Sequence, residues 1–405
     1  MKLELTTPNY NCTVVRINKL KELSWCDNVA WYEMFNLQAI VSKDIELWEL
    51  YLLFSVEVEI NQEYLSENNL FRDSARNKDP EAKWYCESHR RVKAIKFRWH
   101  KSSALVMPLS SLSYLGVDLS EFKEWDCFNN INWTILCQKY VAPVGEQWNK
   151  IKWSSKTSKK IDNKTFPEHM DSANYWRSIE QFKDDDNVVV TQKLHWSSII
   201  FGNVLVRKNL NWIDKLLIKL WVDIELKEYE SIYGSRRVIL NNAKPFWKKI
   251  NDQYKNLIPK DWIIYWEIIW WDWESQIQKS YTYWLMKWEC ELYVYRVSIC
   301  NQDWIAIDLP WDGVKKYCDQ VWMKYCPELW KWNHKDFIVD EWMNRQFHKE
   351  WLTQCLPLSD KWTFDEWVIV RREWIIPYLT KAKCDNFLMY ESKVLDEWEA
   401  DTESI

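Results

Sequence analysis

The sequence predicts an α+β protein in which a small all-β domain precedes a mixed domain. Residues 1–142 alternate apolar and polar positions in short runs such as "CTVVRI" and "RVKAIKFRW", which is typical of the short strands of a small barrel or sandwich. From about residue 170 onward, strand patterns mix with helical ones, as expected of an α+β domain. A chain of 405 residues is long enough for two such domains.

The elements of the mixed domain each have a recognisable pattern. A helix is predicted for "SANYWRSIEQF", with Ser172 as its N-cap. Further helical segments are predicted at "AKPFWKKINDQYKNL" and "WDGVKKYCDQVW". Apolar runs rich in β-branched and aromatic residues predict strands at "NVVVTQKL", "DWIIYWEII", "ECELYVYRVSI" and "DEWVIVRRE".

A polar segment separates the two predicted domains. The stretch "EQWNKIKWSSKTSKKIDNKTFPEHMDS" is rich in Lys, Ser and Asn and poor in apolar residues, so we interpret residues 143–169 as a linker or exposed loop. The mixed domain then covers residues 170–395, and an acidic tail covers residues 396–405.

Charge and cysteine content limit the classes of protein. The formal net charge of −5 lacks the global basic signature of a nucleic-acid binder, so such a surface would have to be local. The 11 cysteines form no CxxC pairs and have no histidines at zinc spacing, and the first residues lack the pattern of a signal peptide. A cytoplasmic protein without a protein partner is the expectation. The most apolar run, "WIIYWEIIWW", contains Glu267 and is far shorter than the ~20 residues that span a bilayer.

The tryptophan content is unusual, and glycine is scarce. The chain has 32 Trp and 5 Gly, whereas ordinary usage of about 7% Gly would give roughly 28 glycines. The excess of one residue therefore matches the deficit of the other.

Local context supports an exchange of the two residues. In "TQKLHWSSIIF", Trp196 occupies a tight turn between two predicted strands, where glycine is usual. Trp273, Trp304 and Trp362 follow polar turn formers, and Trp398 lies in the acidic tail. Our hypothesis is that the gene uses UGA for glycine and that UGA was translated as tryptophan. A truly tryptophan-rich chain is the alternative.

With glycine restored, six motifs follow one another in the order of a known enzyme family. The first motif becomes K-L-H-G at residues 193–196. The five motifs after it read "YGSRR" (233–237), "IIYWEIIW" (263–270), "LYVYRV" (292–297), "DEWVIVRRE" (365–373) and "KAKCDNF" (381–387) as written. With glycine in place of tryptophan, the second of these five contains YGEIIG and the fourth contains DEGVIV. This set resembles the nucleotidyltransferase motifs of ATP-dependent RNA ligases over residues 165–395. The first domain resembles the N-terminal OB-like module of one bacterial branch of these ligases.

The resemblance implies an activity and its cofactors. The chain would join RNA 3′-hydroxyl and 5′-phosphate ends, using ATP with Mg²⁺ or Mn²⁺. Lys193 would be the nucleophile that stores AMP as a phosphoramide, since a neutral amine can attack the α-phosphate of ATP. Lys381 and Lys383, two apart on a predicted strand, would face the same side, bind the α-phosphate and lower the pKa of that amine.

Further residues receive roles from the same resemblance. Arg236 and Glu267 would lie near the ribose, Glu366 near the divalent ion, and Tyr295 would stack on adenine. His195 is either an ATP contact or a turn-capping residue. The chain departs from the family at two positions, because Arg296 stands where an acid is common and Gln192 where relatives often have Glu.

Other interpretations stay open at this point. Taken alone, Lys193 would be a solvated lysine at a strand end, and Tyr295 a core residue. The basic runs "HRRVKAIKFRWHK" and "KIKWSSKTSKK" are either solvated faces or a track for an RNA backbone, at a nick or at single-strand ends. A ligase for nicked DNA or RNA/DNA hybrids, or a nucleic-acid-binding protein that has lost catalysis, are the alternative functions.

Overall fold

A computed structural model describes residues 1–97, 99–141, 166, 172–195, 197–235, 245–270, 281, 283, 285–286, 289–300, 305–337 and 364–393. Contacts divide the chain into two compact units. The N-terminal unit comprises Met1–Asn149 and Lys383–Ile405, and the second unit comprises Lys150–Ala382. The predicted linker lies outside the described residues except for Phe166, and so does the predicted tail.

The N-terminal unit consists mainly of short antiparallel sheets, as expected from its alternating sequence. Its central sheet has the strand order β10-β6-β2-β11, and smaller sheets have the orders β3-β4-β5, β1-β12-β13, β14-β7 and β8-β9. The strands are β1 (Leu3–Glu4), β2 (Cys12–Arg16), β3 (Lys21–Glu22), β4 (Val29–Met34), β5 (Leu37–Ser42), β6 (Leu50–Ser55), β7 (Val58–Ile60), β8 (Ile95–Phe97), β9 (His100–Ser102), β10 (Ala104–Pro108), β11 (Cys127–Phe128), β12 (Asn130–Ile131), β13 (Thr134–Ile135) and β14 (Cys137–Lys139). The helices are α1 (Gln62–Glu67) and the 3₁₀ turns η1 (Ser74–Arg76), η2 (Leu109–Leu115) and η3 (Leu119–Glu121).

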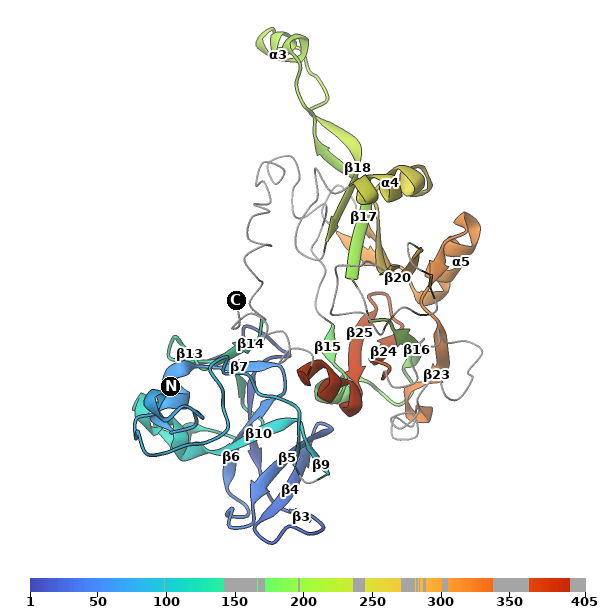
Figure 1. The fold of residues 1–405 in the computed structure, drawn as a ribbon. Helices are drawn as coiled ribbons and strands as arrows, with labels where there is room; N and C mark the ends of the chain where they lie inside the picture. The colour runs from blue at the N-terminus through green and yellow to red at the C-terminus, as the bar shows by residue number, and fades with distance from the viewer. Residues whose placement is uncertain are drawn as a thin grey trace. The chain divides into compact units, whose positions relative to one another are not determined.

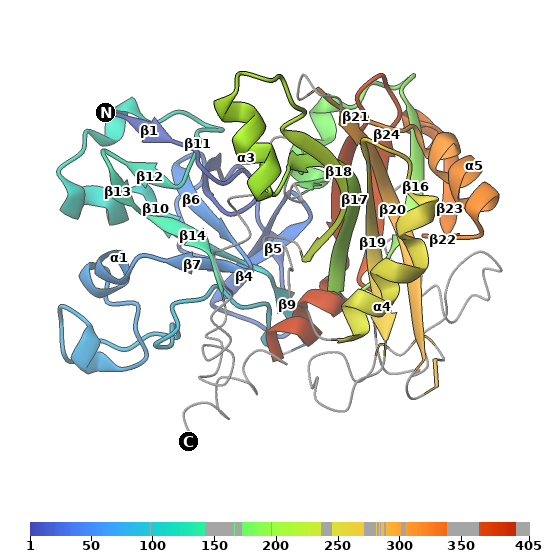
Figure 2. The same ribbon diagram turned by 90° about the horizontal axis from the view of Figure 1, so that it is seen from above.

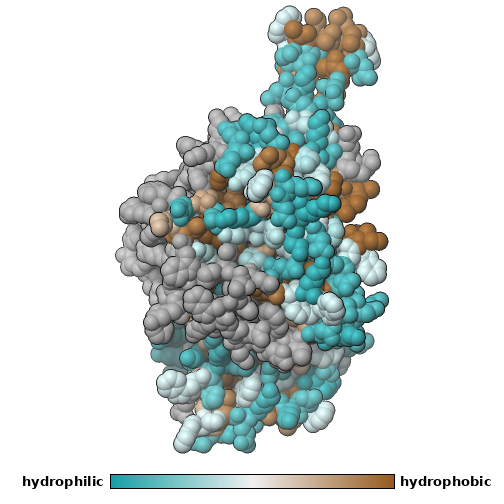
Figure 3. Space-filling model, turned by 90° about the vertical axis from the view of Figure 1, so that its right-hand side faces the viewer, coloured by the Kyte–Doolittle hydropathy of each residue, from teal (hydrophilic) through white to brown (hydrophobic). Residues whose placement is uncertain are grey.

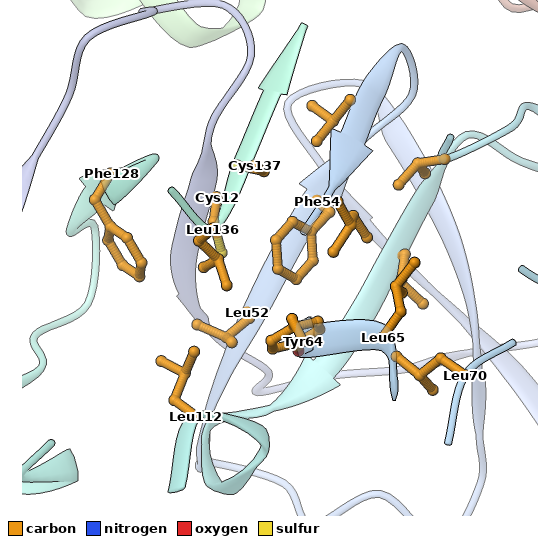
Figure 4. Packing of buried hydrophobic residues seen from close by; sticks show 14 of the residues in the cluster. Cys12, Leu52, Phe54, Tyr64, Leu65, Leu70, Leu112, Phe128, Leu136 and Cys137 are labelled. Atoms are coloured by element: carbon orange, nitrogen blue, oxygen red, sulfur yellow. The ribbon is translucent and has the colours of Figure 1, made fainter. Parts of the chain in front are cut away.

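Strand β6 separates two hydrophobic cores of this unit. Leu52 and Phe54 belong to the cluster drawn in Figure 4, which also contains Tyr64 from α1. Tyr51 and Leu53, which alternate with them, belong to a second cluster. Because successive side chains of a strand point to opposite faces, a strand that is apolar throughout is buried on both faces.

The C-terminal segment of the chain packs within the N-terminal unit. Residues 385–393 are helical, and Leu388 joins the second core cluster. The hydroxyl of Ser392 accepts a hydrogen bond from the backbone N–H of Ala94 at 3.1 Å, and its carbonyl accepts one from Arg91 at 3.3 Å. From the sequence, these residues are expected in the second domain, because a helix that follows a strand usually packs next to it. Their contacts instead group them with the first.

The second unit contains two larger sheets. One has the strand order β15-β25-β24-β16-β23, and the other has the order β18-β17-β19-β20-β21, with β22 paired to β20. Most neighbours are antiparallel, and β15–β25 and β20–β22 are parallel. The strands are β15 (Ala173–Asn174), β16 (Asn187–Lys193), β17 (Ser197–Arg207), β18 (Lys227–Ser235), β19 (Trp262–Trp270), β20 (Cys290–Cys300), β21 (Ala306–Asp308), β22 (Lys324–Tyr325), β23 (Glu328–Asn333), β24 (Trp367–Arg372) and β25 (Tyr378–Lys383). The expectation of an α+β fold is confirmed as a mixed fold with several antiparallel sheets.

Two of the three predicted helices are present. They are α4 (Pro245–Tyr254), continued by the 3₁₀ turn η5 (Lys255–Leu257), and α5 (Trp311–Val321). Figure 2 shows them beside the β17–β20 sheet, where the Tyr254 ring meets the Trp266 ring with centroids 5.1 Å apart. The third prediction is wrong: the segment after Ser172 forms β15 and then the 3₁₀ turn η4 (Trp176–Gln181). No side-chain cap supports that turn. A further 3₁₀ turn, η6, spans His334–Asp336.

A long hairpin carries a helix that the sequence analysis missed. Strands β17 and β18 pair from Ile199–Ser235 to Arg207–Lys227, and α3 (Trp212–Lys219) stands at their tip (Figure 1). A reciprocal cap starts this helix: the Asn211 side chain accepts from the Asp214 N–H at 2.8 Å, and the Asp214 carboxylate accepts from the Asn211 N–H at 3.0 Å. The signal was present in the sequence as N-x-x-D.

Apolar side chains gather on the surface at α3. Figure 3 shows this end of the hairpin largely in the colour of hydrophobic residues. Exposed members are Trp212, Ile213, Leu216, Leu220 and Trp221. Within the part of the chain that the structure describes, no helix combines the length and the apolar character needed to cross a membrane.

Candidate active site

The end of strand β16 brings Lys193 to a buried carboxylate. Lys193 pairs with Trp367, the first residue of β24, and Glu366 immediately precedes that strand. The Lys193 Nζ lies 2.6 Å from Glu366 Oε1. The Glu366 side chain is only 5% exposed and that of Lys193 is 23% exposed. Because burial of an unpaired carboxylate is very unfavourable, this ion pair is required for the arrangement to be stable.

His195 binds the second oxygen of the same carboxylate. Its Nδ1 lies 3.1 Å from Glu366 Oε2, across 171 residues of sequence. Its backbone N–H donates to the Tyr283 hydroxyl at 3.0 Å, and its ring meets the Tyr281 ring edge-on at 4.5 Å between centroids. The Tyr281 hydroxyl donates to the carbonyl of Phe364 at 2.7 Å, just before Glu366. His195 therefore helps to position Glu366 as well as to form the turn after β16.

Glu267 lies on the neighbouring sheet, opposite Ser198 on one side and Tyr293 on the other. Burial raises the pKa of Tyr295 well above its ordinary value, and the negative charge of Glu267 adds to this increase. The Tyr295 hydroxyl is hydrogen-bonded to that of Ser198. The pKa of Tyr283 is also raised, first by burial and then by nearby carboxylates that include Glu267. Glu267 thus acts electrostatically on two tyrosines, one of which contacts His195.

Cys326 is a buried thiol that is influenced electrostatically by both Lys193 and Glu267, and the sequence did not indicate it. The residue is buried, and its backbone N–H donates to the carbonyl of Val294 at 2.9 Å. Burial raises the pKa of its thiol far above the usual range; Glu267 raises it further, whereas Lys193 lowers it. The charges of Lys193 and Glu267 therefore act on the same group. A single cysteine in the sequence has no pattern that could have indicated this position.

Tyr281 and Tyr283 were also missed. Both are buried, and both contact His195. The only signal in the sequence was the alternation in "YTYW", which suggests that the two tyrosines share a face.

The two lysines of the last motif have different surroundings. Lys381 lies on β25, opposite Asn174. Lys383, at the end of the same strand, belongs to the N-terminal unit. Its Nζ lies 2.8 Å from Glu57 Oε1 and 3.0 Å from Glu391 Oε2. A role for either lysine at the α-phosphate stays a prediction, as do the roles of Arg236 and of residue 196, which lie outside the described residues.

Arg296, which the sequence analysis noted beside Tyr295, is paired with a carboxylate. Its Nε lies 2.8 Å from an Asp308 oxygen, and its guanidinium lies 4.6 Å from the centroid of the Tyr265 ring. Asp308 also accepts a hydrogen bond from the Ser298 hydroxyl. Arg296 is therefore part of a buried ionic network beside Tyr295.

A Mg²⁺ or Mn²⁺ ion at this site stays a prediction. Among the described residues, no group of three or more His, Cys, Asp or Glu side chains is arranged to hold a metal. Mg²⁺ is usually bound by one or two carboxylates and completed by substrate phosphates and water. Both oxygens of Glu366 contact Lys193 and His195, so a metal role for Glu366 would require one of these contacts to open.

Comparisons with known proteins identify the fold. No protein-family model and no curated protein matches the chain. Among solved structures, a lysine-to-alanine mutant of the Naegleria gruberi RNA ligase with ATP and Mn matches 94% of this chain and 98% of its own, with TM-score 0.61 and 12% identity. A lysine-to-methionine mutant with AMP and Mn gives 0.60 and 11% over the same shares. The same ligase with PPi gives 0.59 and 12%, again over these shares. Over nearly its whole length, this chain therefore has a fold similar to that of the Naegleria gruberi RNA ligase.

Proposed function

We propose that the protein is an ATP-dependent RNA ligase that acts through a covalent lysyl-AMP on Lys193. One observation carries the proposal: on an RNA ligase fold, Lys193 and His195 meet the two oxygens of buried Glu366 at 2.6 and 3.1 Å. The family motifs assign these three residues to one site although they are far apart in the sequence. A solvated strand-end lysine would have no reason to face a buried carboxylate.

The reaction consists of three transfers. The Lys193 amine attacks the α-phosphorus of ATP, so that an N–P bond forms and the bond to pyrophosphate breaks. An oxygen of the RNA 5′-phosphate then attacks the same phosphorus and releases the lysine. Finally, the RNA 3′-hydroxyl attacks the activated 5′-phosphate, loses its proton and releases AMP. The division replaces one difficult condensation with easier steps.

The ion pair with Glu366 has a consequence for the first transfer. An amine attacks only after it has lost its proton, so Lys193 must leave the Glu366 carboxylate or pass the proton on before the N–P bond forms. His195, on the other carboxylate oxygen, keeps Glu366 in place during this change. Positioning and charge neutralisation account for most of the catalysis of phosphoryl transfer.

The remaining roles follow the family. Glu366 would hold a Mg²⁺ or Mn²⁺ ion, which supplies charge neutralisation at the phosphates. Glu267 and Arg236 would bind the ribose, and Tyr295 would stack on adenine. Lys381 and Lys383 would bind the α-phosphate. In the structure Tyr295 is bound to Ser198, so stacking would need adenine to reach the face of the ring while its hydroxyl stays bound.

An RNA substrate is favoured over DNA by the K-L-H-G form of the first motif and by the N-terminal unit. We propose that this unit is an OB-like module that binds RNA, at a nick or at single-strand ends. Its sequence includes a basic run from His89 to Lys101. A ligase for nicked DNA or for RNA/DNA hybrids remains the alternative, and matched nicked duplexes of each kind would distinguish them.

The decisive experiment is transfer of label from α-labelled ATP to the protein in the presence of Mg²⁺ or Mn²⁺, followed by a denaturing gel. The chain with glycine at positions 196, 266, 270 and 367 should become labelled, and Lys193→Ala should abolish the band. Lys208→Ala is the matched control, since Lys208 also pairs with a carboxylate, Asp214, at 3.4 Å. Binding of RNA without any labelled band would instead favour a protein that has lost catalysis.

A further inference from the structure

The backbone divides the tryptophans into two groups. In the described residues, sixteen residues other than glycine have φ between 45° and 124°. Half of them form the group that we name the left-handed tryptophans: Trp25, Trp48, Trp99, Trp125, Trp133, Trp221, Trp322 and Trp367. Asn, which tolerates this region best among non-glycine residues, supplies three. Tryptophan should be among the rarest residues there, because its side chain begins at a Cβ that this conformation disfavours.

Glycine is almost absent from the positions that normally need it. Of the glycines in the described ranges, only Gly116 has a positive φ. Gly202 lies in β17, where an added Cβ would stand 2.9 Å from the Phe166 ring. Gly313 lies inside α5. Tryptophan thus occupies the turns that require conformational freedom, whereas the remaining glycines mostly occupy regular structure.

Two helices end with a left-handed tryptophan where a glycine is usual. Trp322 follows α5 with φ 59° and ψ 37°, close to the 63° and 25° of Gly116 after its 3₁₀ helix. The Met323 N–H donates to the Cys318 carbonyl at 2.9 Å, which closes a Schellman-type cap. The end of α3 is the same: Trp221 has φ 58°, and Val222 donates to Leu217 at 3.0 Å. Both caps require the left-handed residue.

At most of the left-handed tryptophans, side-chain packing does not compensate for the strain of a positive φ. Seven of the eight indoles are between 52% and 96% exposed. Trp133 has the ammonium of Lys2 over its ring, 4.0 Å from the centroid, which is a weak interaction at an exposed site. An indole in water gains almost nothing from its large apolar surface. Trp125 also meets the Phe35 ring edge-on, at 5.9 Å between centroids, and such isolated contacts at exposed sites do not require tryptophan at these turns.

Trp367, the eighth, is buried and lies opposite Lys193 in the sheet. Its φ of 124° falls in a region that is essentially restricted to glycine. The indole Nε1 is buried without a hydrogen-bond partner, which is unfavourable for a polar group. A glycine here would remove both the strained conformation and the unsatisfied donor next to the candidate nucleophile.

We infer that the natural residue is glycine at all eight left-handed tryptophans, and that their codons are UGA codons which the source organism reads as glycine. Composition, local context and the motifs indicate an exchange that includes Trp367, and the backbone independently identifies glycine positions at all eight of these residues. The inference does not depend on the proposed function, because seven of the eight positions are turns or helix ends at the surface.

Peptide mass spectrometry of the protein isolated from the organism that encodes it tests the inference directly. Peptides that cover positions 221, 322 and 367 should contain glycine, and the corresponding codons in the gene should be UGA. Tryptophan at any of these three positions, or a UGG codon there, would overturn the assignment. Neither result depends on whether the protein ligates RNA.

A folding experiment tests the physical argument separately. Trp322→Gly should raise the folding equilibrium constant about fivefold relative to Trp322→Ala, since alanine removes the indole but keeps the Cβ. Trp212→Gly is the matched control: Trp212 is also exposed, but it begins helix α3 and lacks a positive φ, so glycine there should lower the constant. If the chain with tryptophan does not fold, the starting protein is the chain with glycine at all eight positions. Its stability is then compared with that of variants that carry alanine or tryptophan at position 322. Equal stability of the glycine and alanine chains would refute the backbone argument.

Discussion

The two units of the molecule differ in where their unusual tryptophans lie. In the N-terminal unit, all five left-handed tryptophans are exposed. In the second unit, Trp221 and Trp322 are exposed at helix ends, but Trp367 and Trp266 are fully buried, next to Glu366 and Glu267. An indole at a surface turn can point into water, so only the backbone is strained. An indole in the core must also displace other groups, so we expect tryptophan in place of glycine to be most damaging at the candidate active site.

The largest expected effect follows from this difference. A protein with tryptophan at positions 196, 266, 270 and 367 should be insoluble or fail to form lysyl-AMP, whereas the chain with glycine at these four positions should form it readily. Each glycine would relieve roughly 1 to 3 kcal/mol of strain where the backbone is unfavourable. The measurement is the labelled band from α-labelled ATP. Strong labelling of the chain with tryptophan at these positions would contradict two hypotheses: that position 196 lies in a turn that needs glycine, and that these tryptophans are encoded by UGA codons.

Within the active chain, the carboxylate of Glu366 should matter almost as much as the nucleophile. Lys193→Ala should abolish labelling while RNA binding persists, since the lysine acts by covalent chemistry. Glu366→Gln should slow lysyl-AMP formation by about a hundredfold, because a neutral amide cannot replace the charge that faces Lys193 and His195. Single-turnover kinetics with labelled ATP provide the rates. An unchanged rate in Glu366→Gln would exclude Glu366 from the chemistry, and parallel loss of RNA binding would indicate misfolding.

Surface turns should give smaller and more uniform effects in both units. Replacement of Trp25 or Trp133 in the N-terminal unit, or Trp221 in the second, by glycine should stabilise the protein by about 1 kcal/mol each. Urea unfolding curves measure this as a shift in midpoint at constant slope. A loss of stability in these variants would show that the exposed indoles contribute packing that the structure does not reveal.

The smallest effect concerns alkaline pH and should be equal in the two units. Burial raises the pKa of Cys86 in the N-terminal unit and of Cys318 in the second unit to about 12, from 9.0. The folded protein then keeps protons that the unfolded chain releases, so this stabilisation is present below pH 9 and is lost as the pH rises toward 12. Urea midpoints at pH 8, 9 and 10 should fall progressively. Cys86→Ala and Cys318→Ala should each reduce that fall, and an unchanged pH dependence in both would contradict the assignment.

The candidate site shows what could and could not be predicted. Lys193, His195 and Glu366 were identified from ordered motifs, and the structure brings these three together. The motifs did not indicate that His195 contacts Glu366 and Tyr283, because these contacts join segments far apart in the sequence. For the same reason, the ion pairs of Lys383 with Glu57 and Glu391 could not be anticipated.

Local patterns in the sequence determined most of the strands, since side-chain alternation and β-branched residues act within a few positions. They also determined helices α4 and α5. Composition together with local context was enough to suggest that glycine and tryptophan are exchanged. Tertiary structure decided the rest. Helix propensity after Ser172 was overridden because Ala173 and Asn174 pair with β25, and residues 385–393 joined the N-terminal unit because their apolar face packs in its core. For most of the left-handed tryptophans the glycine position became evident only in the fold, because φ at each turn is set by the strands and helices that the turn connects; Trp367 was already indicated by its motif.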